Sequence, residues 1–222
     1  PQYNFTGSIN MIIGGENSDN YYSGYYSGAQ IVNLSNDTRT CNNFPDYPIA
    51  MRGATGAIVS DQPIICGGRS EGSDAHSECY HHSKANNSWT LLTKMVTKRE
   101  TSASVPINGK LLVLGGWDGG NRLATSEYVS PDGDASQPGP DLPRPRSEHC
   151  AVKLANGQVM LLGGWPRENF KSAIIFHPDT GFDQSLPPMT FERSSFGCAA
   201  FNSQMHDNRE VVLAVGGYYQ AT

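Results

Sequence analysis

Two adjacent glycines follow a short apolar run at five places in this chain of 222 residues. The runs read MII, PIIC, LLVL, MLL and VLAV, and successive pairs begin 53, 48, 48 and 53 residues apart. So regular a recurrence indicates an internal repeat, which constrains the fold more than any local pattern does. The five pairs are Gly14-Gly15, Gly67-Gly68, Gly115-Gly116, Gly163-Gly164 and Gly216-Gly217.

Two further landmarks recur with the glycine pairs. Arginines stand 47 residues apart at Arg52, Arg99, Arg146 and Arg193. An aromatic residue follows the first glycine by 13 positions at Tyr80, Tyr128 and Phe176. Short apolar runs between Gly- and Pro-rich turns are typical of an all-β chain. A period near 50 with four strand-like segments in each unit predicts a β-propeller of four-stranded antiparallel blades.

The unit at 99–145 shows the plan of one blade. After its arginine, TSASVPI is expected to be a strand, the turn Asn108-Gly109 a hairpin, and KLLVLGG a buried second strand. SEYVS is the expected third strand, and a Pro/Gly-rich stretch carries a weak outer strand. The chain divides into units at about 1–51, 52–98, 99–145, 146–192 and 193–222, of which the first and last are incomplete.

Together these residues resemble the kelch repeat, through the double glycine, the Tyr80 and Trp89 pair, and the arginine that begins each unit. The resemblance covers essentially the whole chain and implies a kelch-type β-propeller, whose blades surround a central channel with the first strand innermost. Such propellers usually close with six or seven blades. Because open sheet edges are a liability, we expect an incomplete ring that a missing segment or another chain completes.

The cysteines predict one disulfide. Cys66 directly precedes a glycine pair and Cys79 directly precedes Tyr80, so the repeat puts both on neighbouring strands of one blade. Opposed residues on paired strands lie about 4.5–5.5 Å apart, within disulfide reach. Two buried thiols are the alternative. Cys150 and Cys198 occupy matching places in successive inner strands and are interpreted as core thiols or as partners of missing sequence.

Four N-glycosylation sequons begin at Asn4, Asn33, Asn36 and Asn86. The last three fall where the third strand of a blade turns into the fourth, an exposed edge of the propeller. Together with the expected disulfide, this placement predicts a secreted, extracellular protein.

Composition and motifs argue against several classes of function. The net charge of −5 without a basic run speaks against nucleic-acid binding. Apolar runs of four to six residues are far below the roughly 20 of a membrane span. The run from Cys79 to His82 suggests a metal site, but neighbours on a strand point to opposite faces, and His81 and His82 are interpreted as solvated. No catalytic constellation, cofactor or metal is expected.

A ligand is expected at one mouth of the channel. The first two strands of a blade form a hairpin, so residues that begin the first strand and residues that follow the glycine pair gather at one end. Arginine beside tryptophan suits carboxylates, sulfates and sugar rings. In the alternative interpretation the repeated arginines hold blade to blade and the aromatics cover the glycines. The expected binding face comprises Arg52, Arg69, Arg99, Arg146, Trp117, Trp165 and Tyr218.

The sequence therefore predicts a non-catalytic extracellular module that binds a protein or glycan through its propeller face. Two alternatives stay open. One is the propeller fragment of a secreted copper enzyme of the galactose-oxidase type, with its chemistry elsewhere. The other is an intracellular kelch adaptor, which would have reduced cysteines and no glycan.

Overall fold

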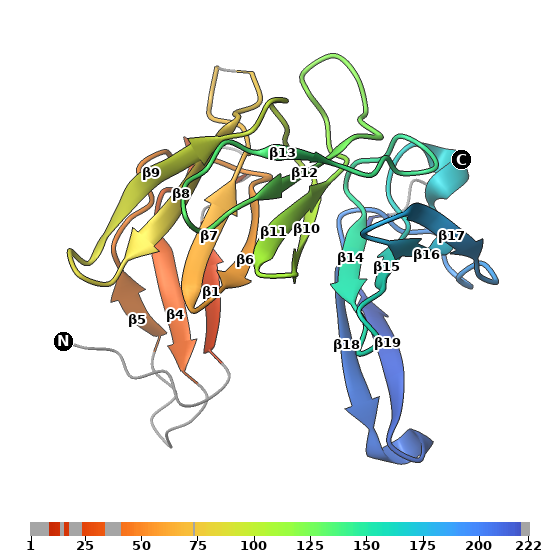
Figure 1. Ribbon diagram of the computed structural model, residues 1–222. Coiled ribbons are helices and arrows are strands. Elements are labelled where there is room, and N and C mark those ends of the chain that lie inside the picture. The colour runs from red at the N-terminus through yellow and green to blue at the C-terminus, as the bar shows by residue number, and fades with distance from the viewer. Residues whose placement is uncertain (1–8, 14–15, 18–23, 34–40, 73, 219–222) are drawn as a thin grey trace.

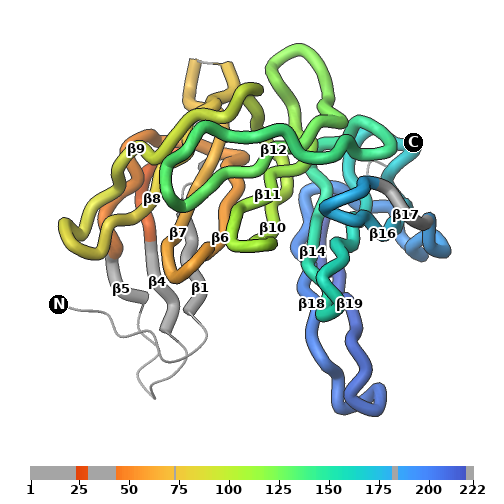
Figure 2. Tube along the Cα trace, in the orientation of Figure 1, coloured from red at the N-terminus to blue at the C-terminus, as the bar shows by residue number. Residues whose placement is uncertain are grey.

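The computed structural model describes residues 9–13, 16–17, 24–33, 41–72 and 74–218, whose regular structure is almost entirely antiparallel β-sheet (Figure 1). Figure 2 traces the chain from sheet to sheet in sequence order. Each sheet is named here as a blade, numbered from the N-terminal side. The all-β, four-stranded propeller architecture predicted from the repeat is confirmed.

Three blades have four strands, each paired with the next along the chain. The second blade contains β6 (Thr55–Val59), β7 (Gln62–Cys66), β8 (Glu78–Ser83) and β9 (Ser88–Lys94). The third contains β10 (Ala103–Ile107), β11 (Lys110–Leu114), β12 (Ser126–Val129) and β13 (Gln137–Gly139). The fourth contains β14 (Cys150–Lys153), β15 (Val159–Leu162), β16 (Ala173–His177) and β17 (Gly181–Ser185).

The blades at either end have fewer strands among the described residues. The first consists of β1 (Ile9–Ile13), β4 (Ala29–Asn33) and β5 (Cys41–Phe44), beside a short hairpin of β2 (Glu16–Asn17) and β3 (Gly24–Tyr25). The fifth is the hairpin of β18 (Gly197–Ser203) and β19 (Arg209–Val215). Two single-turn 3-10 helices are η1 (Arg167–Asn169) and η2 (Gln204–His206). In the described part of the chain, no helix has the length and apolar character needed to cross a bilayer.

Apolar side chains fill the space between neighbouring blades. Between the second and third blades, Ile64, Cys66 and Cys79 meet Leu111 and Val113. Strand β11 is covered on both faces, and its last four residues have no exposed surface. Burying one such side chain stabilises a fold by about 1.5–3 kcal/mol, so the blades are held face to face by their cores.

The glycine pairs at 67–68, 115–116 and 163–164 follow the second strands of their blades, at places where the backbone leading into the following blade approaches. Gly115 has a φ of +59°, and a Cβ there would lie 2.5 Å from the carbonyl oxygen of Arg146. The same contact recurs at Gly67 with the carbonyl of Arg99. Only a residue without a side chain meets both demands, which explains the repeat.

We expect Gly115→Val to lower the free energy of unfolding by about 3 kcal/mol or more, because strain at positive φ adds to a backbone clash. The matched control is Gly109→Val, since Gly109 also has a positive φ, of +72°, but nothing lies within 4 Å of its added Cβ. Urea unfolding of both variants would measure the difference. Equal losses would show that the close approach is incidental.

The three repeated aromatics do not share one structural position, although their spacing is constant. Tyr80 lies opposite Ile65, two residues before its glycine pair, whereas Tyr128 lies opposite Leu112, three residues before. Phe176 lies opposite a residue four positions before its glycine pair. The connection between the second and third strands shortens by one residue from each blade to the next. Because strand side chains alternate between faces, Tyr80 packs toward the first blade and Tyr128 toward the fourth.

Candidate functional site

A cavity of about 370 Å³ opens at the mouth where the first strands begin and the second strands have ended. We call it the mouth cavity. Four blades and the connections between them contribute to its wall. Its lining consists of Arg52, Gly53, Glu100, Thr101, Trp117, Arg122, Ser147, Glu148 and Ser195.

A chain of backbone hydrogen bonds joins the blades around this cavity. The N–H of Thr101 donates to the carbonyl of Gly53, that of Glu148 to Thr101, and that of Ser195 to Glu148, at 2.7–2.9 Å. All four residues have φ between 50° and 64°. Non-glycine residues rarely adopt this conformation, and they do so where the surroundings fix it. The wall of the mouth cavity is thus built from backbone held in one conformation.

Strand bridges at the mouth show that Arg52 is one residue out of step with the other repeated arginines. Arg52 pairs with Arg69, just as Glu100 pairs with Trp117. The place that Arg99 takes in the third blade therefore belongs to Met51 in the second, which is 1% exposed. The 47-residue spacing is a coincidence at its first member, because the unit from Met51 to Arg99 spans 48 residues whereas the next two units span 47.

The structure does not place Arg99 and Arg146 at the mouth. Their residues are only 0% and 1% exposed. The Arg99 guanidinium donates to the carbonyls of Gly115 and Thr125 at 2.7 and 3.0 Å. Arg146 donates to the carbonyl of Gly163 at 3.3 Å and to the hydroxyl of Ser172 at 3.1 Å. These contacts fit the alternative interpretation, in which the repeated arginines hold one blade to the next.

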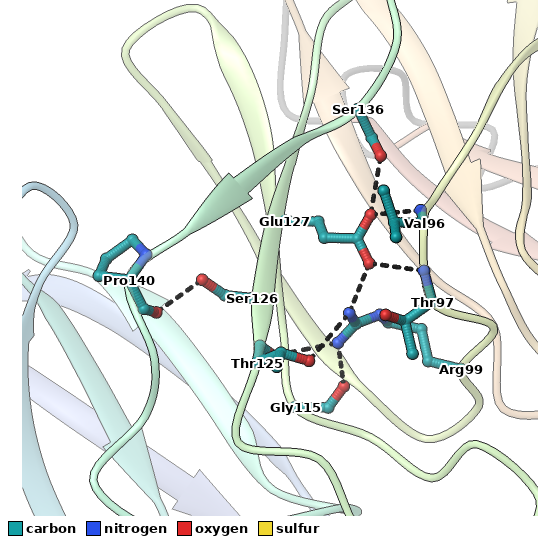
Figure 3. Close-up of polar contacts among 9 residues, drawn as sticks. All are labelled: Val96, Thr97, Arg99, Gly115, Thr125, Ser126, Glu127, Ser136 and Pro140. Atoms are coloured by element: carbon teal, nitrogen blue, oxygen red, sulfur yellow. Dashed lines mark hydrogen bonds and ion pairs between the residues drawn. The ribbon is translucent and has the colours of Figure 1, made fainter.

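Glu127 completes the junction between the second and third blades (Figure 3). Its carboxylate accepts from the backbone N–H groups of Val96 and Thr97, from the Ser136 hydroxyl, and from Arg99 at 2.7 Å. Burial by itself raises the pKa of Glu127, but the bonds from Ser136, Arg99 and the two backbone groups hold that pKa below its ordinary value. The result is a buried ion pair between blades, in which both carboxylate oxygens of Glu127 are hydrogen-bonded.

Two of the predicted arginines do reach the mouth. Arg52 lines the cavity, with its guanidinium 5.5 Å from the ring centre of Tyr25. Arg69 has a side chain that is 40% exposed and lies 3.6 Å from the carboxylate of Glu100. Trp117 lines the cavity as predicted. Tyr218 is exposed on the fifth blade, paired with Ser194, and is not part of the lining.

Arg122 is a mouth residue outside the predicted binding face. Its guanidinium lies 5.3 Å from the ring centre of Trp117 and 5.5 Å from that of Trp165, between two blades. Asp118 makes this possible, because its carboxylate accepts from the N–H groups of Gly120 and Asn121 and turns the loop back. These backbone hydrogen bonds lower the pKa of Asp118. The sequence signal was an arginine soon after an Asp-Gly-Gly turn.

The mouth cavity carries charges of both signs. Glu100 is buried beside Arg69, and the Glu148 carboxylate accepts a 2.7 Å hydrogen bond from the Ser195 hydroxyl. Arg52 and Arg122 stand in the remaining wall. This arrangement can bind a carboxylate at the guanidinium groups and stack an apolar group on the indole of Trp117. The described residues contain no group of three or more His, Cys, Asp or Glu able to hold a metal ion.

Four of the five cysteines form two pairs. Cys66 lies opposite Cys79 in the strand register, with sulfurs 2.06 Å apart. Cys150 on β14 and Cys198 on β18 are also joined, with Cα atoms 6.0 Å apart, which corrects their interpretation as core thiols or as partners of missing sequence. The repeat predicts matching positions for these two cysteines on adjacent inner strands, and side chains at such positions are close enough to form a disulfide.

The interpretation of His82 as solvated is wrong, and His81 is only partly exposed. The ring nitrogens of His81 meet the amide of Gln62 and, at 2.7 Å, the hydroxyl of Thr90. His82 is buried against Phe44 and Trp89. Burial lowers the pKa of His82.

The sequons differ in how far the structure describes them. Asn86 is exposed in the turn between β8 and β9, and Asn33 ends β4. Asn4 and Asn36 lie outside the described residues. Glycosylation at all four therefore stays a prediction.

Residues 99–143 match the kelch motif, and they form the third blade with the connections around it. This part of the chain is a kelch repeat. Comparison with curated proteins gives 27% identity over 133 residues to spermatocyte protein spe-26 of Caenorhabditis elegans, covering 60% of this chain and 22% of that protein. Kelch-like protein 33 of Homo sapiens is 24% identical over 152 residues, covering 66% of this chain and 28% of the relative.

Kelch-like protein 35 of Mus musculus is 26% identical over 153 residues, which cover 68% of this chain and 26% of the relative. The chain thus spans about a quarter of the length of these curated relatives. A solved structure described as the structure of YjhT superposes with a TM-score of 0.71 at 11% identity, covering 79% of this kelch chain and 64% of the other. That likeness shows the fold.

Proposed function

We propose that this kelch chain is a non-catalytic module that binds a protein partner through the mouth cavity, and that the partner supplies an acidic segment. The observation that carries the proposal is the position of Arg52 and Arg122 in one cavity of about 370 Å³ beside Trp117. Similarity to kelch-like proteins supports protein binding over catalysis.

The placement of the charges favours an acidic partner over a basic one. Arg69 faces Glu100, and Ser195 already donates to Glu148, so both carboxylates of the wall have partners within the protein. Arg122 lies between two indoles, with its guanidinium 5.3 and 5.5 Å from their ring centres, and these contacts restrict its motion. A fixed guanidinium binds a carboxylate with two parallel hydrogen bonds and loses little side-chain entropy in doing so.

Arg122→Gln should weaken the binding of an acidic peptide by about tenfold or more, the usual effect of losing a charge-assisted hydrogen bond. The probe is an array of nine-residue peptides rich in Asp and Glu, with Asn and Gln versions as the neutral comparison. Fluorescence polarisation would measure the selected peptides. Lys110→Gln is the matched control, because Lys110 is exposed at the hairpin turn between β10 and β11. Equal loss in both variants would contradict recognition at the mouth.

The two cysteine pairs support an oxidising compartment, since disulfides persist in secreted and extracellular proteins. We expect a peptide map without reduction to recover Cys66 linked to Cys79 and Cys150 linked to Cys198. Free thiols at all four positions would contradict a secreted protein. That result would favour the alternative of an intracellular kelch adaptor, which the kelch-like relatives fit.

A further inference from the structure

The junction between the third and fourth blades contains a buried arginine that lacks the carboxylate found one blade earlier. Arg146 takes the place of Arg99, because each guanidinium donates to the first carbonyl of the next glycine pair. Strand register then identifies the residue that corresponds to Glu127. Glu127 lies opposite the residue two positions before Gly115, and Ile174 lies opposite the residue two positions before Gly163.

A cavity of about 420 Å³ lies at this place. Arg146 and Ile174 line it, together with Arg144, Glu168, Asn169 and Ser172. The cavity therefore lies against the connection that leads into β14 on one side, and against η1 and β16 on the other.

Arg146 has unused capacity to bind an anion. Its Nη1 atom makes the two hydrogen bonds described above, and its buried Nε has no partner, as is also true of Arg99. Among the described residues, no carboxylate comes within 4.0 Å of this guanidinium, although Glu168 borders the cavity. Burial and the neighbouring charge of Arg144 lower the pKa of Arg146 to about 10. A buried cation without a counter-charge is costly unless an anion approaches it.

We propose that this cavity binds a small organic carboxylate, whose carboxyl group takes the place that Glu127 takes in the preceding blade. The guanidinium of Arg146 binds the carboxylate, and the hydroxyl of Ser172 offers a further donor. The apolar wall at Ile174 covers the aliphatic part of the ligand. A short aliphatic acid fits this combination of one cation and one apolar wall better than an inorganic anion does.

The test is a calorimetric titration of the full chain with sodium propionate at constant ionic strength, with sodium chloride as the comparison. We expect saturable binding of propionate and none of chloride. Ile174→Glu supplies a carboxylate from the protein itself. It should weaken propionate binding about tenfold or more, because the new carboxylate binds the guanidinium of Arg146 in place of the ligand. Ile174→Leu should leave the affinity within about twofold.

Two further variants keep the proposal falsifiable if Ile174→Glu fails to fold. Arg146→Met, made in the Arg122→Gln background so that the mouth cavity does not contribute, should abolish propionate binding, whereas Lys110→Gln in the same background should leave it unchanged. The proposal is overturned if wild-type protein shows no saturable binding of propionate. It is also overturned if chloride binds equally well, or if Arg146→Met binds propionate as wild type does.

Discussion

Replacing Glu127 with alanine should destabilise the protein by about 3–5 kcal/mol, the usual cost of leaving one charge of a buried ion pair without its partner. The variant leaves the fully buried guanidinium of Arg99 without a counter-charge. It also leaves the N–H groups of Val96 and Thr97 without their acceptor. Urea unfolding at pH 7 would measure the loss, provided that the m-value stays unchanged.

The chain itself supplies the control. At the preceding junction Met51 takes the place of Arg99, and Tyr80, opposite Ile65, takes the place of Glu127. Both belong to an apolar cluster there. Arg99→Met combined with Glu127→Tyr therefore copies a junction that the protein already uses. We expect the double variant to regain most of the stability lost in Glu127→Ala, because well-packed apolar groups often replace a buried ion pair at little cost.

The double variant separates two explanations of the Glu127 effect. If it is as unstable as the single variant, the stability of this junction depends on the ion pair itself. If it recovers, the ion pair is one of several ways to join blades in this propeller. A single variant with unchanged stability would contradict the structural role altogether.

The fold was predictable from the glycine pairs, because the local backbone at these positions accepts only glycine. Gly67, Gly115 and Gly163 need both a positive φ and the absence of a Cβ, so substitution is penalised at each of these three positions. The glycine pair therefore marks the end of the second strand in each of these blades, even where the loops between pairs differ in length. The strand order of each blade follows from the short apolar runs and turns around it.

The register between landmarks was not predictable to one residue. The connection after each glycine pair changes length by one residue, and this moves a side chain to the other face of a strand. For this reason Tyr80 and Tyr128 face different neighbours, and Arg52 lies at the mouth while Arg99 is buried. The spacing between two repeated residues does not show whether a loop between them has changed length by one residue, and so does not show which face of the strand each side chain is on.

The site was predictable only as a location. Hairpin geometry brought Arg52 and Trp117 to one cavity, as expected. The position of Arg122 depends on the turn that Asp118 closes and on an indole from the next blade, so the Asp-Gly-Gly turn alone could not place it at the mouth. The partner of Arg99 was equally hidden, because Glu127 lies 28 residues away and meets it only when two blades pack.

Lowering the pH from 7 to 5 should destabilise the protein through His149 by roughly 2 kcal/mol, at about 1.4 kcal/mol per pH unit below the ordinary histidine pKa. His149 is 6% exposed, and neither ring nitrogen has a hydrogen-bond partner within the described structure. Burial, with a smaller effect from the charge of Arg146, lowers the pKa of His149 to about 3. The unfolded chain therefore binds a proton that the folded chain excludes, and the loss of stability continues as the pH falls toward 3.

His149→Phe should remove this part of the pH dependence. Phenylalanine is suited to the site, because the chain has a phenylalanine at the corresponding place in the fifth blade. There Phe196 lies against Gly217 much as His149 lies against Gly164. Urea unfolding midpoints of wild type and variant at pH 7, 6 and 5 would measure the difference, with His206→Gln as a control at an exposed position. Glu127 also loses stabilising charge as the pH falls through its lowered pKa, but that contribution is common to all three proteins. The difference between wild type and His149→Phe thus isolates one histidine, and parallel pH profiles would show that His149 is protonated alike in the folded and unfolded chain.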